Sequence, residues 1–370
     1  MKEAMERLLA VARAPREELR RVTAAGKKAV GVLPYFCPEE LVYAAGLLPF
    51  GLWGEALRCA ESKRYFPAFI CSMLHTTLEL GIRGELNGLS AVMVPISCDS
   101  LKGMGANWEA AVPQIPVLNV AYAQNRRLEA GTVFTESQFK KLRGQLEAIA
   151  GAPVADGALR EAIRVFNEDR RAVLAFSEAA AKRPGLVTPS QRSAAIKAGL
   201  YMDRAEHAAL LRRVTAALEA APAETAQRGV VLTGIMAEPA AVTELLGETG
   251  FTVLADQLAQ ESVPCRTLTD EEKEPLRALA ERYGAIEGCS ILYDPTKRRG
   301  HELVELAQKT GAKGVVWLMS KFCDPEEYDY VPVKKMLDEA GIPLLALDVD
   351  QQMQSFEKAR SALEAFAEMI

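Results

Sequence analysis

Two series of short apolar runs, separated by helical segments, constrain the fold of this 370-residue chain most strongly. The runs lie at residues 28–33, 48–53, 91–96 and 115–121, and then at residues 229–234, 251–256, 290–295, 315–319 and 342–348. Short apolar runs bounded by glycine and proline, with helices between them, are typical of parallel strands buried on both faces. The sequence therefore predicts an α/β protein with two open parallel sheets.

The hydrophobic periodicity becomes helical between Thr135 and about Ala221. Residues 157–176 place apolar side chains at i, i+4 and i+7, and Thr188-Pro189 is a suitable cap and first turn for a further helix. We therefore expect an N-terminal α/β domain at residues 1–134, beginning with a helix. A helical segment at residues 135–225 and a C-terminal α/β domain at residues 226–370 are expected to follow.

The overall composition excludes several classes of protein. Hydrophobic residues make up 49% and charged residues 25% of the chain, as in soluble globular proteins. A net charge of -5 and the lack of a basic stripe argue against nucleic-acid binding. No run approaches the ~20 apolar residues that span a bilayer, and the charged N-terminus has no signal sequence. A cytoplasmic protein without membrane contact is expected.

Cysteine and aspartate are adjacent twice, each time between an apolar run and a predicted helix. These pairs are Cys98-Asp99 and Cys323-Asp324, and Cys71 stands before a third predicted helix. The carboxyl ends of parallel strands form the ligand crevice of such folds, and a helix N-terminus favours a thiolate. Three thiols from separate segments could hold three irons of a [4Fe-4S] cluster and leave the fourth iron open.

Other roles for the cysteines remain open. Cysteine is often a small buried hydrophobic residue, and none of the seven forms a C-x-x-C pair. Cys37 is the main alternative as a ligand, because it also follows a predicted strand and precedes a helix. Cys59, Cys265 and Cys289 are expected to have structural roles. In a reducing compartment, an odd number of cysteines favours free or metal-bound thiols over disulfides.

Several acidic residues also follow predicted strands. Asp99 and Asp324 are expected to cap their helices, with catalysis as the less favoured role. Asp256, Gln257 and Glu261 are candidates for the same cleft as the cysteines. The sequence does not identify a catalytic residue.

Three stretches resemble the (R)-2-hydroxyacyl-CoA dehydratase family, at residues 31–50, 94–102 and 321–330. Within that family, the chain is most similar to the smaller beta subunits (component D) of the 2-hydroxyglutaryl-CoA enzymes. The similarity extends to the closing helix at residues 362–368, so it covers nearly the whole chain.

The resemblance implies a hydro-lyase subunit whose Cys71, Cys98 and Cys323 bind a [4Fe-4S] cluster. This oxygen-sensitive cluster would relay one electron for the radical elimination of water from a 2-hydroxyacyl-CoA, giving a 2-enoyl-CoA. The implied partners are a larger alpha subunit, which binds most of the acyl-CoA, and an ATP-dependent iron-sulfur activator protein. Some family members contain flavin, but no residue here indicates a flavin site.

Two alternatives belong to other classes of function. The same superfamily contains benzoyl-CoA reductase subunits and double-cubane reductases, which use similar cysteines to deliver low-potential electrons. The chain could also be a non-enzymatic two-domain binding protein with a hinge at the helical segment. Iron content and the composition of the oligomer discriminate between these alternatives.

Overall fold

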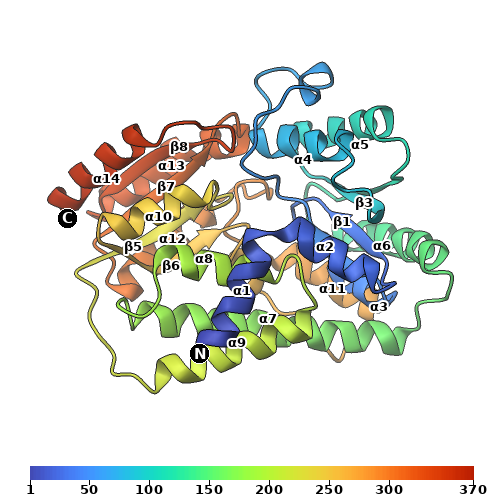
Figure 1. The fold of residues 1–370 in the computed structure, drawn as a ribbon, viewed down its shortest axis with the longest axis horizontal. Helices are drawn as coiled ribbons and strands as arrows, with labels where there is room; N and C mark the ends of the chain where they lie inside the picture. Colours follow the sequence, from blue (N-terminus) through green and yellow to red (C-terminus); the bar gives the residue numbers. More distant parts are fainter.

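Two four-stranded sheets form the framework of the computed structural model, which describes residues 1–370 (Figure 1). The first sheet has the order β2-β1-β3-β4 and the second β6-β5-β7-β8, and all pairs of neighbouring strands are parallel. The first sheet comprises β1 Ala29–Val32, β2 Leu48–Gly51, β3 Leu89–Ile96 and β4 Val117–Ala121. The second comprises β5 Arg228–Gly234, β6 Phe251–Leu258, β7 Gly314–Ser320 and β8 Leu344–Val349. The predicted fold class is confirmed.

Fourteen α-helices cover the sheets. Those before the second sheet are α1 Lys2–Arg13, α2 Pro15–Ala24, α3 Glu39–Ala44, α4 Ser72–Ile82, α5 Asp99–Ala111, α6 Glu129–Ala150, α7 Asp156–Ala181, α8 Pro189–Ala198 and α9 Arg204–Glu219. The others are α10 Ala240–Glu248, α11 Pro275–Ala285, α12 Arg298–Thr310, α13 Asp324–Glu339 and α14 Glu357–Met369. Short 3-10 turns occur at Ser62–Arg64 (η1) and Val263–Cys265 (η2). No helix combines the length and apolar character needed to cross a bilayer.

Complete burial explains why the central strands are so apolar. Every residue of β1 and of β7 is buried, and each of these strands is paired on both sides by parallel neighbours. Helices on both faces of a parallel sheet leave no solvated side, so the strand sequence does not alternate between apolar and polar residues. This pattern is the reason that the strands could be recognised in the sequence.

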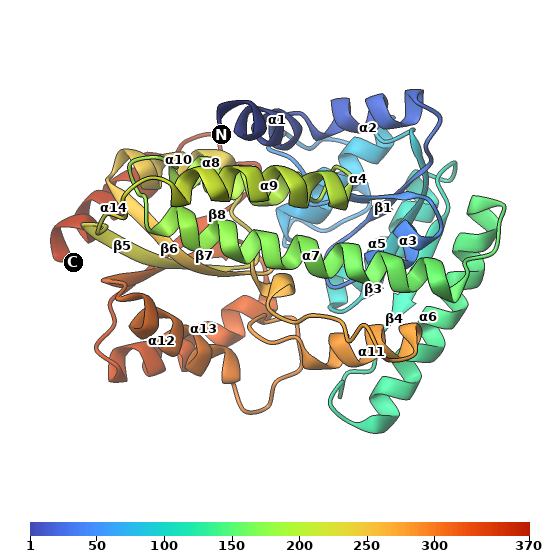
Figure 2. The ribbon, with the colours of Figure 1, turned by 90° about the horizontal axis from the view of Figure 1, so that it is seen from below.

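Helix α7 connects the two halves of the molecule. Figure 2 shows it running across both halves, and it packs against α3 in the first half and β6 in the second. The next helix, α8, has Thr188 as its N-cap and Pro189 in its first turn, as predicted. The Thr188 hydroxyl accepts a hydrogen bond from the N–H of Gln191 (3.2 Å), and the Gln191 side chain accepts one from the N–H of Thr188 (3.0 Å).

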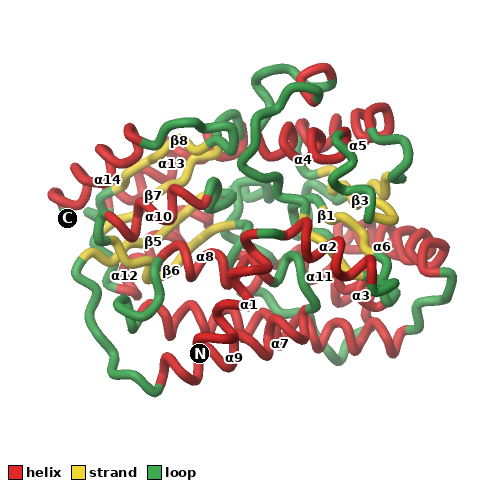
Figure 3. The backbone as a smooth tube through the Cα atoms, in the orientation of Figure 1, coloured by secondary structure: helices red, strands yellow, loops and turns green.

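The chain crosses between the halves more than once. Helix α11 follows the second sheet's first two strands in the sequence but packs against α6 and α7. Helix α1, at the N-terminus, packs against α8 and α9. Figure 3 shows loops gathered between the facing ends of the two sheets. The two halves are therefore joined by several elements, and loops from both reach the region between them.

One predicted strand, at residues 290–295, is wrong. This segment is an irregular loop between α11 and α12. The Asp294 carboxylate accepts hydrogen bonds from the N–H (3.2 Å) and the hydroxyl (2.9 Å) of Thr296, and Pro295 has no N–H for a ladder. Turn chemistry therefore overrides the short apolar run, and the loop lies at the end of the sheets instead of inside one.

Candidate functional site

A cavity of about 750 Å³ lies where loops from the carboxyl ends of the two sheets meet. Residues that follow β3, β4 and β7 line it, together with the loop at 290–297 and the first residues of α4. Open parallel sheets bind their ligands at the carboxyl ends of the strands. The cavity therefore occupies the expected ligand position, and both halves of the chain contribute to it.

The three predicted cysteines all line this cavity. Cys71, Cys98 and Cys323 are the N-cap residues of α4, α5 and α13, respectively. The first N–H groups of a helix have no partner within the helix and favour an anionic group. Three helix N-termini therefore meet at one cavity, each beginning with a thiol.

Burial controls the protonation of these thiols. It raises the pKa of Cys71 to about 12, raises the pKa of Cys98, and raises the pKa of Cys323 well above its ordinary value. Hydrogen bonds from the backbone N–H groups of Leu74 to Cys71 and of Leu101 to Cys98 partly oppose the increase in pKa. The thiols are therefore neutral without a cation beside them, and metal binding must displace their protons.

The turn before Cys323 is conformationally strained. Phe322 has a φ of 63°, in the left-handed region that aromatic residues rarely adopt. The N–H of Lys321 donates to the carbonyl of Val349 in β8 (3.0 Å), and the N–H of Cys323 donates to the carbonyl of Ser320 (3.0 Å). These contacts hold the strained turn against the sheet and fix where the Cys323 thiol lies.

Three hydroxyl groups that the sequence pattern does not predict also line the cavity. The hydroxyl oxygens of Ser97 and Ser290 are buried and have no hydrogen-bond partner. Tyr35 is only 4% exposed, and its hydroxyl makes no hydrogen bond within the chain. Burial raises the pKa of Tyr35 well above its ordinary value, and the neighbouring thiols of Cys323 and Cys71 add to this increase. The only sequence signal for Ser97 and Tyr35 is their position near the ends of predicted strands.

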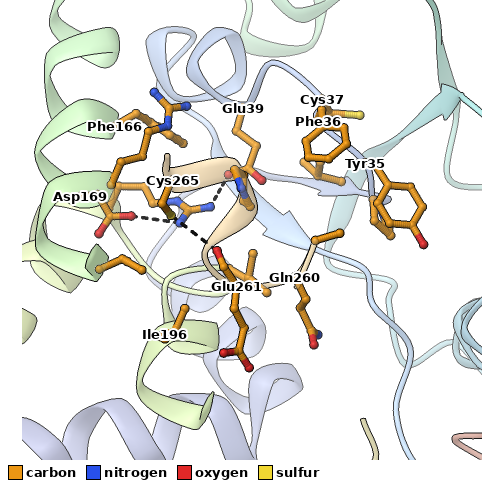
Figure 4. A pocket seen from close by; sticks show the side chains of 18 of the residues that line it. Tyr35, Phe36, Cys37, Glu39, Phe166, Asp169, Ile196, Gln260, Glu261 and Cys265 are labelled. Atoms are coloured by element: carbon orange, nitrogen blue, oxygen red, sulfur yellow. Dashed lines mark hydrogen bonds and ion pairs between the residues drawn. The ribbon is translucent and has the colours of Figure 1, made fainter. Parts of the chain in front are cut away.

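Cys37 lies in a different place. It lines a second cavity, of about 80 Å³, and its thiol donates to the carbonyl oxygen of Leu33 (3.5 Å) (Figure 4). Tyr35 lines both cavities. In Figure 4 its hydroxyl points away from Asp169 and Cys265, which line the second cavity. Cys37 is therefore not among the thiols that line the larger cavity.

The predicted capping roles of Asp99 and Asp324 are wrong. Each is the first residue of its helix, and the cysteine before it occupies the N-cap position without a capping contact from the aspartate. Asp99 is exposed and instead forms an ion pair with Lys102 at 2.8 Å. Asp324 lines the cavity beside Cys323.

Asp256, Gln257 and Glu261, at the end of β6 and just after it, do not line the three-cysteine cavity. Asp256 and Glu261 are buried and both form ion pairs with Arg192 of α8; the Arg192–Glu261 distance is 2.7 Å. Gln257 donates to the carbonyl of Arg299 (3.1 Å). Asp256 and Glu261 join the helical segment to the second sheet, and Gln257 joins β6 to α12; a strand-end position alone predicts neither contact.

Comparisons with known proteins agree with this architecture. Residues 34–370 match the family model described as 2-hydroxyglutaryl-CoA dehydratase, D-component. The chain belongs to this family. The beta subunit of (R)-phenyllactyl-CoA dehydratase from Clostridium sporogenes is 43% identical over 346 residues, covering 93% of this chain and 92% of the relative. The beta subunit of (R)-2-hydroxyglutaryl-CoA dehydratase from Acidaminococcus fermentans is 35% identical, covering 99% of this chain and 98% of the relative.

A more distant relative belongs to a reductase. This protein, one of the subunits of benzoyl-CoA reductase from Thauera aromatica, is 24% identical, covering 93% of this chain and 91% of the relative. The higher identities to the dehydratase beta subunits confirm the predicted dehydratase family. Because the most similar of these three is named for phenyllactyl-CoA, the comparisons do not single out 2-hydroxyglutaryl-CoA as a substrate.

The donor set in this dehydratase-family chain suits an iron-sulfur cluster better than a single metal ion. No three His, Cys, Asp or Glu side chains converge closely enough to hold one ion. The three thiols are instead distributed around a large cavity, together with helix N-termini and unpaired hydroxyls. A cluster of several irons is larger than one ion, is anionic and accepts N–H and O–H hydrogen bonds at its sulfurs.

Proposed function

We propose that this chain is the beta subunit of a 2-hydroxyacyl-CoA dehydratase and that Cys71, Cys98 and Cys323 hold its [4Fe-4S] cluster. The observation that carries the proposal is that these cysteines, distant in sequence, each begin a helix at the same cavity. The family and the names of the relatives support the class of reaction. The same cysteines are the ones that the resemblance indicates.

The reaction needs an electron because its polarity is unfavourable. Hydroxide must leave from the α-carbon of a thioester, and the β-hydrogen that is removed with it is not acidic. One electron on the thioester carbonyl allows hydroxide to leave and makes the β-hydrogen acidic, and the electron is returned when the 2-enoyl-CoA forms. The bound cluster would supply low-potential single electrons for this chemistry.

The residues of this chain would hold and shield that group. The three thiols provide ligands, and the walls of the cavity limit access of water. Tyr293, Phe322 and Tyr328 line the cavity although they are 39%, 37% and 79% exposed, so the cavity opens at this apolar rim. Exposed apolar groups of this kind mark interaction surfaces. We propose that this rim is covered by the larger alpha subunit, which also binds most of the acyl-CoA.

Anaerobic co-production with the larger subunit tests the proposed function. The two subunits should co-purify, and the pair should dehydrate a 2-hydroxyacyl-CoA only when the ATP-dependent activator is present. Phenyllactyl-CoA and 2-hydroxyglutaryl-CoA should be compared as substrates. Full dehydration by this chain with the activator alone would contradict the assignment. A complex of two identical chains with a larger cluster would favour the reductase alternative.

The rim can be tested separately with Tyr328→Glu. A charge at this position should reduce co-purification with the larger subunit, because it would be buried in the proposed interface. Val133→Glu is the matched control, since Val133 is also exposed, at 52%, but lies on α6. Equal recovery of the complex with both variants would show that the rim is not the interface.

A further inference from the structure

The hydroxyls of Ser97, Ser290 and Tyr35 line the 750 Å³ cavity together with the thiols, and those of Ser97 and Ser290 are buried without a hydrogen-bond partner. Ser97 precedes Cys98 at the end of β3, Ser290 lies in the loop before α12, and Tyr35 follows β1. These hydroxyls therefore reach the cavity from three separate segments. Each of these hydroxyl groups can donate a hydrogen bond but donates none to another group of the chain.

An unpaired buried hydroxyl costs about 1–3 kcal/mol, and most such groups in folded proteins are satisfied. Two such hydroxyls, with that of Tyr35 in the same cavity, indicate that the cavity receives a group able to accept hydrogen bonds. The lysines that line the cavity are already paired, because Lys102 contacts Asp99 (2.8 Å) and Lys297 contacts Asp329 (2.7 Å). The three hydroxyls, unlike these lysines, are not committed to a partner within the chain.

We propose that the hydroxyls of Tyr35, Ser97 and Ser290 donate hydrogen bonds to the iron-sulfur group and thereby set its reduction potential. This inference rests on the proposed function, since it needs a cluster on Cys71 and the other two thiols. Donors to an anionic cluster stabilise the reduced form most, because that form carries the extra negative charge. The three residues are positioning and tuning groups, and they do not act as ligands.

Tyr35 provides the sharpest test because the cavity contains a matched control. Tyr122 also lines the cavity, but its hydroxyl donates to the carbonyl oxygen of Phe36 at 3.0 Å. Tyr35→Phe removes an uncommitted donor, whereas Tyr122→Phe removes one that is already used. Each variant removes one hydroxyl from a tyrosine that lines the cavity.

The experiment uses the complex with the larger subunit, purified without oxygen. Iron and sulfide are measured first, followed by a redox titration monitored by electron paramagnetic resonance. A Cys71→Ser complex identifies which part of the spectrum belongs to this chain. Tyr35→Phe should keep its iron but show a lower midpoint potential and an altered spectrum. At a fixed solution potential, its ratio of reduced to oxidised cluster should fall on the order of tenfold. Tyr122→Phe should titrate as the unmodified complex does.

Ser97→Ala and Ser290→Ala give the second test, because each removes one donor with little change in volume. Both should shift the midpoint in the same direction as Tyr35→Phe, which also covers the case in which Tyr35→Phe loses its iron. Iron-loaded Tyr35→Phe or serine variants with unchanged midpoints and spectra would overturn the inference while leaving the cluster assignment intact. Absence of iron from this chain in the unmodified complex would instead overturn the proposed function itself.

Discussion

The hydroxyl of Thr76 donates a hydrogen bond of 2.7 Å to Oε1 of Gln351, which lies 275 residues later in the chain. Gln351 also donates from Nε2 to the carbonyl of Trp53 (2.7 Å) and from its backbone N–H to the hydroxyl of Ser72 (3.1 Å). Gln351 follows β8, whereas Ser72 and Thr76 belong to α4, whose N-cap is Cys71. One buried amide therefore ties the helix that presents Cys71 to the second sheet, which presents Cys323.

Gln351→Leu should weaken this connection between the halves. The carbonyl of Trp53 would lose its bond from Gln351, and the hydroxyl of Thr76 would keep only the carbonyl of Met73 (3.2 Å), so the free energy of unfolding should fall by about 1–3 kcal/mol. Gln354→Leu is the control, because Gln354 is exposed and bonds only to neighbouring carbonyls. Chemical denaturation measures both. Equal stability of the two variants would mean that the Gln351 contacts contribute nothing measurable.

Arg192 should be among the most sensitive positions of the helical segment. Arg192→Met leaves the buried carboxylates of Asp256 and Glu261 without their shared cation, so the free energy of unfolding should fall by about 3–5 kcal/mol. Arg212→Met removes an exposed pair with Glu168 and should change stability by about 0.5 kcal/mol or less. Denaturation curves test the contrast, and similar losses in both variants would contradict it.

Glu18 should make stability depend on pH in the acid range. Burial opposes its ionisation, but hydrogen bonds from Arg21 and Arg7 outweigh burial and lower the pKa of Glu18 from 4.5 to about 2. The unfolded chain binds more protons between these values, so this contribution is complete above pH 4.5 and is lost as the pH falls towards 2.

Glu18→Gln should therefore lower the free energy of unfolding at pH 7 by about 1–3 kcal/mol. The variant's free energy of unfolding should also change less with pH between 4.5 and 2. Urea denaturation across this range measures the effect. Glu17→Gln, at the exposed preceding position, should follow the unmodified chain. The account of Glu18 fails if its variant keeps the full acid dependence.

The features that could be predicted from the sequence are those that burial marks locally. β1 and β7 are buried throughout and almost entirely apolar because both faces are covered, and Cys98 and Cys323 follow strands that this pattern identifies. The same pattern gave a false strand at residues 290–295, because a short apolar run does not show that Asp294 forms a turn with Thr296.

The features that could not be predicted depend on contacts between distant segments. No local pattern connects Gln351 with Thr76 or Arg192 with Asp256, since each pair is formed only when the halves pack. Tyr35 is similar, because its lack of a hydrogen-bond partner is a property of the folded cavity and not of its neighbours in the sequence.

Iron and acid-labile sulfide in single cysteine variants test the central claim most directly. Cys71→Ser, Cys98→Ser and Cys323→Ser are purified anaerobically with the larger subunit and compared with Cys37→Ser, whose thiol lines the other cavity. Each of the first three should lose the iron, sulfide and visible absorption that belong to this chain, whereas Cys37→Ser should retain them. Unchanged iron and sulfide in any of the three cavity variants would contradict the cluster assignment.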